Sequence, residues 1–470
     1  MSKAIDKLHG VFSRHLAWPL LYGPWRPEKN LCLRYWGEKR ALLLRPLAER
    51  LEIRRNNLSE LLAYAGTRIP YWRERFTRLG IDPLHLGDPF AALAALPVLK
   101  RRTVQERLTE LIADDSGGCF PLPNSSGGST GEPLNFFTDR HSRARVTAAA
   151  WAADSAAGWY PGAPSVWLWG SDRDALRSAS FSGRLKLGLR NQTLFNTFDI
   201  SEPGLLEAHR WMQDHPPELL VGYASSVHLL ARLLAEQRLT PRYPARGLVT
   251  SAETLSPVMR REIEEVFGEG KVFNRYGSRE TGPIGWETAE HDGIYLNLDD
   301  LVVELLDSRD RHALAGTPGR AVVTTLHHRV MPLIRFDLED LAEWSVLPGE
   351  SRDRAPRFSR VLGRFSDTIR TSGGKLIHGE FFTHLFYGQS TVRRFQFVQH
   401  EPDRYELRYE AAGPLKPGLR DSLTDRLRKV LGETARIEFA HCAKIEPLVS
   451  GKHRFTASKV TGDHRGGEES

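Results

Sequence analysis

From about residue 120 onward, short apolar runs alternate with segments of helical spacing, and Gly- and Pro-rich turns separate them. Two of the apolar runs are Ser165–Trp169 and Leu219–Val221, and the helical stretches lie around 225–237 and 256–267. This alternation predicts an α/β fold. At 470 residues the chain is long enough for two or three domains, each with a sizeable apolar core.

The regions on either side of this alternation have different patterns. Residues 34–115 are predicted to be mainly helical, with Pro46 just before a first helical turn and Asn57 or Ser59 as the cap of a further apolar run. Residues 294–345 hold strand-like runs separated by turn residues, which predicts a β-rich subdomain.

The segment 347–361 is charged and contains two prolines, so we expect a linker or a hinge-proximal loop there. A small α+β domain of about 100 residues is predicted to follow it. Residues 461–470 are expected to form a frayed tail.

Charged residues are mixed along the chain rather than grouped. The 65 lysines and arginines exceed the 58 aspartates and glutamates, which gives a net charge of +7, but the densest basic cluster is only Lys100-Arg101-Arg102. Such dispersion is typical of a solvated surface, with a smaller contribution that favours anionic substrates such as nucleotides. Paired Cys/His spacings and an aromatic-basic consensus are missing, so we expect no nucleic-acid partner.

Cysteine spacing and the N-terminal pattern bear on the compartment. Cys32, Cys119 and Cys442 lie far apart, which excludes a disulfide framework and argues against a four-ligand zinc site. Apolar patches in residues 1–25 are interrupted by a histidine and two prolines, unlike a signal peptide or a membrane span. We expect a soluble protein of the reducing cytoplasm, without stable membrane insertion.

Residues 124–133 form a glycine-rich run, NSSGGSTGEP, with three glycines and four hydroxyl side chains. Small residues let the backbone approach an anion, and backbone N–H and hydroxyl groups can donate to phosphate oxygens. The run lacks the Gly-Lys-Ser/Thr of the common P-loop, and by itself a flexible surface turn remains an alternative. The residues that would form a phosphate cradle are Ser125, Ser126, Gly127, Gly128, Ser129, Thr130 and Gly131.

Five later segments contain further candidate motifs. They are Ser251-Ala252-Glu253-Thr254, 274–280 (NRYGSRE), 334–341 (IRFDLEDL), 363–377 (GRFSDTIRTSGGKLI) and 445–454 (IEPLVSGKHR). Together these segments resemble the motifs of the adenylate-forming superfamily, which includes acyl-CoA synthetases, luciferases and the adenylation domains of peptide synthetases. The resemblance covers essentially the whole chain.

The resemblance implies a nucleotide site. In it Tyr276 packs on adenine, Asp340 binds both ribose hydroxyls and Glu280 helps to hold the magnesium ion of the nucleotide. Arg279 stands where many members have Thr or Ser and would meet a phosphate by charge-assisted hydrogen bonding, and Glu339 replaces a common Gly. The remaining residues of the implied nucleotide site are Ser251, Ala252, Glu253, Gly277 and Ser278.

Two cations complete the implied catalytic set together with Glu280. Arg364 is expected to contact the nucleotide, and Ser366 stands at the usual pivot position of the hinge. Lys452, in a Gly-flanked segment, would swing onto the acid and the α-phosphate and neutralise charge as pyrophosphate departs.

The N-terminal stretches 62–76, 80–83 and 96–100 resemble the opening of the phenylacetate-CoA ligase group and of its CapK-type capsule-biosynthesis relatives. The implied fold is a large multi-layer α/β domain with a β-rich subdomain, followed by a small, mobile α+β lid domain. The expected boundaries are 1–115 for the helical N-terminal region, 116–362 for the adenylate-forming core, 363–460 for the lid and 461–470 for the flexible tail.

The implied reaction activates a carboxylic acid with ATP and Mg²⁺ as acyl-AMP, with release of pyrophosphate, and then transfers the acyl group. The face Ser372-Gly373-Gly374 would admit the acceptor, or would form only a turn. Tyr223, Trp169 and Trp286 are candidate walls of an acid pocket, with a core role as the alternative.

Three functions compete at this stage. The first is a CoA ligase for an aryl or other organic acid. The second is a ligase that transfers the acyl group to an amine or hydroxyl of a metabolite or sugar, or to a carrier protein. The third is a non-catalytic nucleotide-binding protein, suggested by the departures at Arg279, Glu339 and Ser366.

Overall fold

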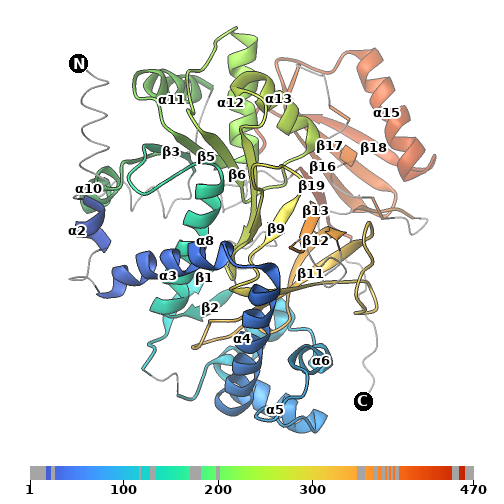
Figure 1. Cartoon of the computed structure of the whole chain (residues 1–470). Coiled ribbons are helices and arrows are strands. Elements are labelled where there is room, and N and C mark those ends of the chain that lie inside the picture. Colours follow the sequence, from blue (N-terminus) through green and yellow to red (C-terminus); the bar gives the residue numbers. More distant parts are fainter. Residues whose placement is uncertain are drawn as a thin grey trace. The chain divides into compact units, whose positions relative to one another are not determined.

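A computed structural model gives the fold of the chain (Figure 1). The structure describes residues 17–22, 27–115, 118–126, 134–169, 181–196, 202–346, 355–364, 369–372, 376–377, 381–382, 385–386, 391–446 and 455–460. It divides into two compact units, one containing Met1–Leu338 and Ala342–Val361, and the other containing Glu339–Leu341 and Leu362–Leu448.

Helices dominate the N-terminal part of the first unit, as predicted. They are α2 (Trp18–Tyr22), α3 (Pro27–Leu43), α4 (Leu47–Arg68), α5 (Pro70–Leu79), α6 (Pro89–Ala95), α7 (Arg101–Glu106) and the 3₁₀ helix η2 (Leu108–Leu111). Pro46 directly precedes α4, as expected, but the predicted cap at Asn57 or Ser59 is wrong because α4 continues unbroken through both positions. Leu58, Leu61 and Leu62 are fully buried, so packing of this face overrides the local capping signal.

The first unit is built on an 11-stranded sheet with the order β10-β11-β12-β13-β9-β8-β7-β6-β5-β3-β4. Strands β3 to β7 pair in parallel, and β7, β8, β9 and β13 pair as antiparallel neighbours, as do β10 and β11. The strands are β3 (Ser165–Leu168), β4 (Gln192–Phe195), β5 (Leu219–Tyr223), β6 (Gly247–Ser251), β7 (Val272–Ser278), β8 (Gly282–Trp286), β9 (Ile294–Leu296), β10 (Leu301–Leu306), β11 (Pro318–Thr325), β12 (Phe336–Val346) and β13 (Arg357–Arg364). The α/β prediction is therefore confirmed.

Helices connect the parallel strands. They are α10 (Phe181–Leu189), α11 (Glu202–Asp214), α12 (Ala224–Glu236) and α13 (Pro257–Phe267), while α8 (Arg140–Ala156) precedes β3. Asp139 begins α8 with a capping box, in which its carboxylate accepts from the backbone N–H of Ser142 at 2.8 Å. A separate hairpin of β1 (Leu122–Ser125) and β2 (Asn135–Thr138) precedes α8.

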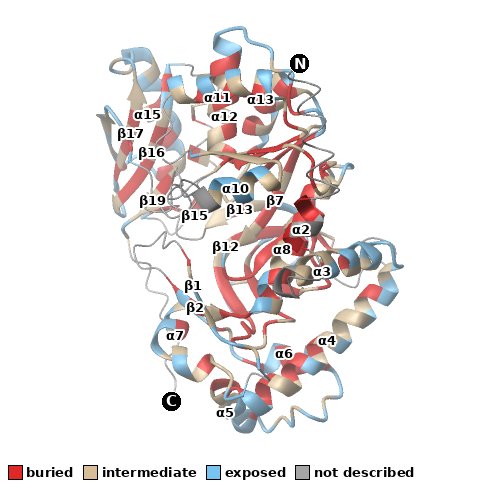
Figure 2. Cartoon of the chain, turned by 90° about the vertical axis from the view of Figure 1, so that its left-hand side faces the viewer, coloured by how far each residue is buried: buried red, intermediate tan, exposed pale blue. Residues whose placement is uncertain are grey.

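The strand-rich stretch predicted over 294–345 is present, but its strands belong to the same sheet as the parallel ones. The predicted loop 347–361 needs a correction, because residues 357–361 are the first part of β13. Arg360 contributes to this strand by donating to the Glu343 carboxylate at 2.8 and 2.9 Å, so the charges of this segment serve cross-strand pairing. Buried residues follow the strands and the inward sides of the helices (Figure 2).

The second unit has a four-stranded sheet in the order β18-β17-β16-β19, with α15 (Pro417–Leu431). Its strands are β16 (Val392–Glu401), β17 (Arg404–Ala411), β18 (Arg436–His441) and β19 (Thr456–Ser458), and a small pair consists of β14 (Ile369–Arg370) and β15 (Leu376–Ile377). Leu423, Leu427 and Leu431 of α15 pack with Phe397 and Leu407 in one apolar cluster. This α+β composition agrees with the predicted fold class.

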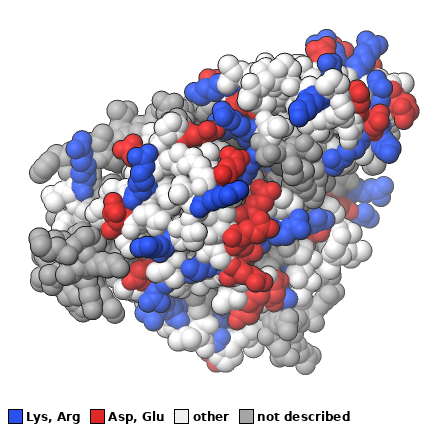
Figure 3. Space-filling model, turned by 90° about the horizontal axis from the view of Figure 1, so that it is seen from above, with Lys and Arg blue, Asp and Glu red and all other residues white. Residues whose placement is uncertain are grey.

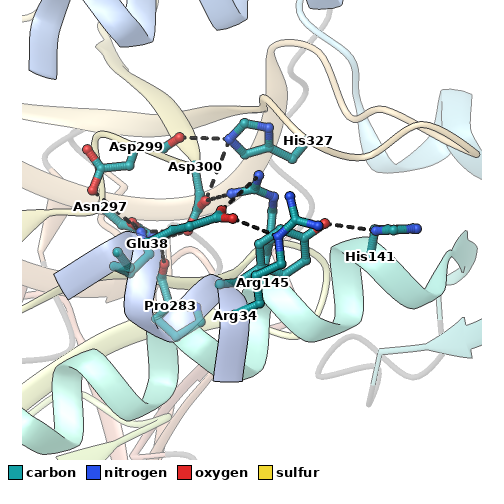
Figure 4. Close-up of polar contacts among 11 residues, drawn as sticks. Arg34, Glu38, His141, Arg145, Pro283, Asn297, Asp299, Asp300 and His327 are labelled. Atoms are coloured by element: carbon teal, nitrogen blue, oxygen red, sulfur yellow. Dashed lines mark hydrogen bonds and ion pairs between the residues drawn. The ribbon is translucent and has the colours of Figure 1, made fainter. Parts of the chain in front are cut away.

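A buried polar network links α3 and α8 to the loops beside β10 in the first unit (Figure 4). Lys39 donates to the Asn297 amide at 2.6 Å and lies 2.8 Å from the Asp300 carboxylate. His327 reaches the backbone carbonyl of Asp299 at 2.9 Å, and Arg145 lies 3.7 Å from Asp300. Removing one partner from such a buried pair destabilises the fold, because the remaining charge then carries its full desolvation cost.

The face drawn in Figure 3 carries lysines and arginines beside aspartates and glutamates, in keeping with the mixed charge of the sequence. Across the described residues, no helix is both long and apolar enough to cross a membrane.

Candidate functional site

Four of the predicted site segments come together at the carboxyl ends of the parallel strands. Tyr223 at the end of β5 pairs with Ser251 at the end of β6, and Ser251 pairs with Arg275 of β7. Trp169 directly follows β3, and its ring stacks on that of Tyr223 with centroids 4.3 Å apart. In open α/β sheets, ligands bind outside the carboxyl ends of the strands where the strand order reverses. Here β3 has β4 on one side and β5 on the other, so the reversal falls at Trp169 and Tyr223.

The segment Ser251–Glu253 makes a tight turn out of β6. Ala252 has a left-handed backbone with φ of 69°, and the Ser251 hydroxyl donates to the Arg275 carbonyl at 2.9 Å. Glu253 accepts from the backbone N–H of Ser225 at 2.8 Å, in the first turn of α12. The Glu253 side chain therefore fixes this turn against the start of a neighbouring helix.

The base of the glycine-rich run is closed by the β1–β2 hairpin. The Ser126 backbone N–H donates to the Leu134 carbonyl at 2.9 Å, and the Leu134 N–H donates to the Ser126 hydroxyl at 3.2 Å. Ser125 pairs with Asn135 across the hairpin. The predicted cradle residues Gly127, Gly128, Ser129, Thr130 and Gly131 lie outside the described residues.

Two arginines join the base of this run to the segment that ends at Glu280. Arg279 donates to the Ser125 carbonyl at 3.3 Å. Arg101 donates to the Ser126 hydroxyl at 3.2 Å and lies 4.0 Å from the Glu280 carboxylate, which is itself buried. Two segments about 150 positions apart in the sequence thus meet in space, with cations between them.

Sequence reasoning missed Arg101, which it counted within a solvated basic cluster. The structure places Arg101 in the first turn of α7 with its side chain only 14% exposed. The available signal was its position directly after 96–100, one of the stretches that carry the family resemblance.

Tyr276 and Gly277 lie on β7, where the strand turns into β8. Tyr276 is buried and its ring meets that of Phe358 edge-on at 6.2 Å. A Cβ on Gly277 would come within 2.7 Å of the Gly282 carbonyl oxygen, so the hairpin needs glycine there. Ser278 ends the strand and its hydroxyl lies 3.1 Å from that of Thr281.

Asp340 and Arg364 lie near each other in the second unit, with 3.8 Å between the Asp340 carboxylate and the Arg364 Nε. Glu339 has φ of 62°, a left-handed conformation that explains why the resembling segment commonly has glycine. Ser372 is an exposed turn residue. Ser366, Gly373, Gly374 and Lys452 lie outside the described residues.

Trp286, a candidate wall of the acid pocket, is buried against Ala152 and Ala153 of α8. Trp169 and Tyr223 lie at the carboxyl ends of β3 and β5, whereas Trp286 ends β8, which is separated from β5 by β6 and β7. The structure therefore brings two of the three candidate pocket aromatics together.

A resident metal centre finds no support in the part of the chain that the structure describes, where no group of three or more His, Cys, Asp or Glu could hold an ion. A single buried carboxylate such as Glu280 nevertheless suits Mg²⁺, because this ion usually takes one or two carboxylates together with nucleotide phosphates.

Sequence comparisons identify relatives along most of the chain. Residues 369–459 match the CapK C-terminal domain family. The chain is 21% identical over 425 residues to protein CapK of Staphylococcus aureus, covering 89% of this chain and 91% of that protein. It is 26% identical over 381 residues to a phenylacetate-coenzyme A ligase of Thermus thermophilus, covering 77% of this chain and 81% of the ligase.

Solved structures share the fold. A 2-hydroxyisobutyryl-CoA ligase in the postadenylation state, in complex with R3-HIB-AMP, is 22% identical with a TM-score of 0.68, covering 87% of this chain and 90% of that one. ATP-bound MatB from Rhodopseudomonas palustris is 14% identical with a TM-score of 0.51, covering 71% and 66%. The resemblance inferred from the motifs, to the CapK-type and phenylacetate-CoA ligase-like branch of the adenylate-forming superfamily, is confirmed.

Proposed function

We propose that this chain, which has the fold of adenylate-forming ligases and a CapK C-terminal domain, activates a carboxylic acid with ATP. A carboxylate oxygen attacks the α-phosphorus, the bond to the bridging oxygen of pyrophosphate breaks, and acyl-AMP remains. The observation that carries the proposal is the junction of Ser125 and Ser126 with Glu280 through Arg101 and Arg279. Two arginines thus connect the start of the glycine-rich run, which would bind phosphate, to the Glu280 carboxylate, which would bind Mg²⁺. Their positive charge is opposite to that of the phosphates.

In this proposal each described residue has a positioning or charge-balancing task. Tyr276 supports adenine, Asp340 accepts from the ribose hydroxyls and Arg364 stays close enough to Asp340 to reach the same nucleotide. Glu280 would hold the Mg²⁺ that arrives with ATP, and the ion would neutralise charge on the phosphates. Lys452 is assigned from the sequence motif and would neutralise the developing charge during adenylation.

For the second half-reaction we propose transfer to CoA. In that step the thiol sulfur loses its proton to solvent and bonds to the acyl carbon, the bond from that carbon to the phosphate oxygen breaks, and AMP leaves with the oxygen that came from the acid. The similarity to the Thermus phenylacetate-coenzyme A ligase supports this acceptor. A second acceptor class is an amine or hydroxyl of a metabolite or sugar, or a carrier-protein thiol. The segment 369–459, which matches the CapK C-terminal domain, contains the Ser372-Gly373-Gly374 face that would admit either class of acceptor.

The test is pyrophosphate release over a panel of aryl and aliphatic acids, with and without CoA, for wild type and Lys452→Ala. We expect acid-dependent release in wild type and at least a hundredfold loss in the variant, because one preorganised charge of this kind contributes on the order of 10²–10³ in rate. Lys459→Ala, also in the C-terminal unit, is the matched control and should leave the rate unchanged.

The outcomes separate the three functions. Acid-dependent release without any need for CoA would favour the second acceptor class. ATP binding with no acid-dependent release, and no difference between wild type and Lys452→Ala, would leave only a nucleotide-binding protein.

A further inference from the structure

A cavity of about 800 Å³ lies against one face of β3 and β4 in the first unit, beneath α2, α8 and α10. Figure 1 shows α2 and α10 at this edge of the sheet. The volume is typical of sites for drug-sized ligands, which are larger than a single ring. The cavity extends from Ser165 at the start of β3 to Trp169 just after its end, about 13 Å at the usual rise of a strand.

Aromatic side chains dominate its wall. They are Trp18, Tyr22, Trp151, Trp159, Trp167 and Trp169. The ring of Trp18 stacks on Tyr22 at 4.8 Å and meets Trp151 edge-on at 5.0 Å. Such rings bind a flat apolar group by stacking and edge contacts, and the observed packing holds them in place before a ligand arrives.

Two hydrogen-bond donors in this wall have no acceptor. The indole N–H of Trp18 and the Nε–H of Arg190 are both buried, and neither finds a hydrogen-bond partner within the described part of the chain. Trp18 is only 4% exposed. A buried donor without an acceptor is costly, so each such group in a cavity wall suits an acceptor supplied by a ligand.

These donors and the adenylation site lie toward opposite ends of β3. Arg190 comes just before Gln192, which pairs with Ser165 at the start of β3. Trp169 lies at the carboxyl end, stacked on Tyr223 beside Ser251. The Arg190 guanidinium lies 5.6 Å from the centroid of the Tyr22 ring, on which Trp18 stacks, so Trp18 lies at the same end as Arg190. An acid bound along β3 with its carboxylate at Trp169 would therefore bring its remote end to Trp18 and Arg190.

Among the wall residues that the structure describes, the acidic one is Asp154, and its charge is balanced by an arginine. Asp154 accepts from Arg275 at 2.7 Å, and both side chains are buried. Arg275 also lies over the ring of Trp167, at 5.9 Å from its centroid. The charged groups at the remote end are therefore cations, Arg190 and Lys186, beside the neutral Ser165 and Gln192.

We infer that this cavity is the acid pocket, and that the substrate is an elongated aromatic carboxylic acid with a hydrogen-bond acceptor at the end remote from its carboxylate. The inference rests on the proposed function for the position of the carboxylate. It replaces Trp286 in the predicted pocket by Trp18, Trp151, Trp159 and Trp167, and it assigns Trp18 and Arg190 as specificity-determining residues.

The test uses a pair of acids with nearly the same shape, 4′-methoxybiphenyl-4-carboxylate and 4′-ethylbiphenyl-4-carboxylate. Only the first has an acceptor at its remote end. Isothermal titration calorimetry on the full chain without ATP measures both dissociation constants. We expect the methoxy acid to bind roughly tenfold more tightly, because the ethyl acid leaves buried donors unpaired.

Trp18→Phe removes a single N–H donor, whereas Arg190→Met removes the whole guanidinium, including its unpartnered Nε–H and its contact with Tyr22. Each change should lower the ratio of the two constants severalfold. Trp72→Phe is the matched control, because Trp72 also has a buried, unpartnered indole N–H but belongs to a different apolar cluster. It should leave the ratio unchanged. Each ratio is measured within one variant, so a general loss of stability does not imitate the effect.

Equal binding of the two acids, no binding of either, or a ratio unaffected by both Trp18→Phe and Arg190→Met would overturn the inference. The same acids in the pyrophosphate assay separate it from the proposed function. Selective binding without pyrophosphate release would contradict the function and leave the aromatic-acid site. Pyrophosphate release with acids whose binding does not depend on Trp18 or Arg190 would contradict the inferred acid pocket and leave the proposed function in place.

Discussion

At the scale of single residues, Glu339 has a backbone conformation that disfavours most side chains. Its φ of 62° lies in the left-handed region, where a Cβ crowds the neighbouring carbonyl oxygen. The resembling family segment commonly has glycine there, which has no Cβ. Glu339 therefore holds this left-handed position within β12, next to Asp340, at a cost in free energy.

We predict that Glu339→Gly is more stable than Glu339→Ala by about 1 kcal/mol, because both remove the carboxylate and only glycine relieves the strain. Chemical denaturation measures the difference. The same pair at Arg261, an exposed position in the middle of α13, should show the opposite order by a similar amount, since glycine weakens a helix interior. An alanine variant at 339 as stable as the glycine variant would contradict this account.

Single residues also show where sequence reasoning stops. Glu280, Asp340 and Arg364 could be proposed as site residues from motifs, because each motif fixes a residue type at a given spacing. Arg101 could not, because a basic residue in a short charged cluster looks the same whether it faces solvent or turns inward to Ser126. Tertiary packing determines whether Arg101 faces solvent or the interior, and the periodicity of the sequence does not show this packing.

At the scale of elements, the β7–β8 hairpin has its tightest approach at Gly277. An added Cβ would meet backbone atoms of Gly282 and Pro283 at 2.7 and 3.0 Å, and backbone moves less easily than a side-chain tip. The strand carries Tyr276 and leads to Glu280, so any shift of the hairpin would also move the proposed nucleotide contacts.

We predict that Gly277→Ala lowers the free energy of unfolding by roughly 1–3 kcal/mol, as overpacking does elsewhere, and weakens ATP binding. Calorimetric titration with ATP and thermal unfolding measure the two effects. Gly87→Ala is the control, because a Cβ there meets nothing within 4 Å. Unchanged ATP affinity in Gly277→Ala would show that the hairpin does not position the site.

Some helices and strands were predicted correctly from the sequence and others were not. The runs 219–221 and 301–306 were predictable as strands because short apolar runs rich in branched side chains, separated by turn residues, are typical of buried strands. The start of β13 was not, because its charged residues resemble a linker until Arg360 is paired with Glu343 on the neighbouring strand. Likewise, Asn57 and Ser59 favour a cap locally, and only the burial of their neighbours keeps α4 continuous.

At the scale of the whole molecule, the buried network of Figure 4 ties stability to pH through His327. Burial, assisted by the nearby Arg145, lowers the pKa of His327 from 6.5 to about 4. Between these two values the unfolded chain takes up a proton that the folded chain excludes. Stability from this group is therefore present above pH 6.5 and is lost as the pH falls toward 4.

We predict that wild type loses about 2 kcal/mol more stability than His327→Gln between pH 7 and pH 5, on account of this group. Urea unfolding at the two pH values measures the difference. His312→Gln is the control, because His312 is exposed. The same pH-dependent loss in His327→Gln as in wild type would exclude His327 as the cause.

The central claim is that ATP activates the acid as acyl-AMP, and the fate of the carboxylate oxygen tests it most directly. The acid that gives the fastest pyrophosphate release is labelled with ¹⁸O in its carboxylate and turned over with ATP and CoA, and the products are analysed by mass spectrometry. Attack on the α-phosphorus leaves one acid oxygen on the phosphate of AMP, so we predict ¹⁸O in AMP and none in pyrophosphate. Label in inorganic phosphate with ADP as the second product, or unlabelled AMP, would contradict the account.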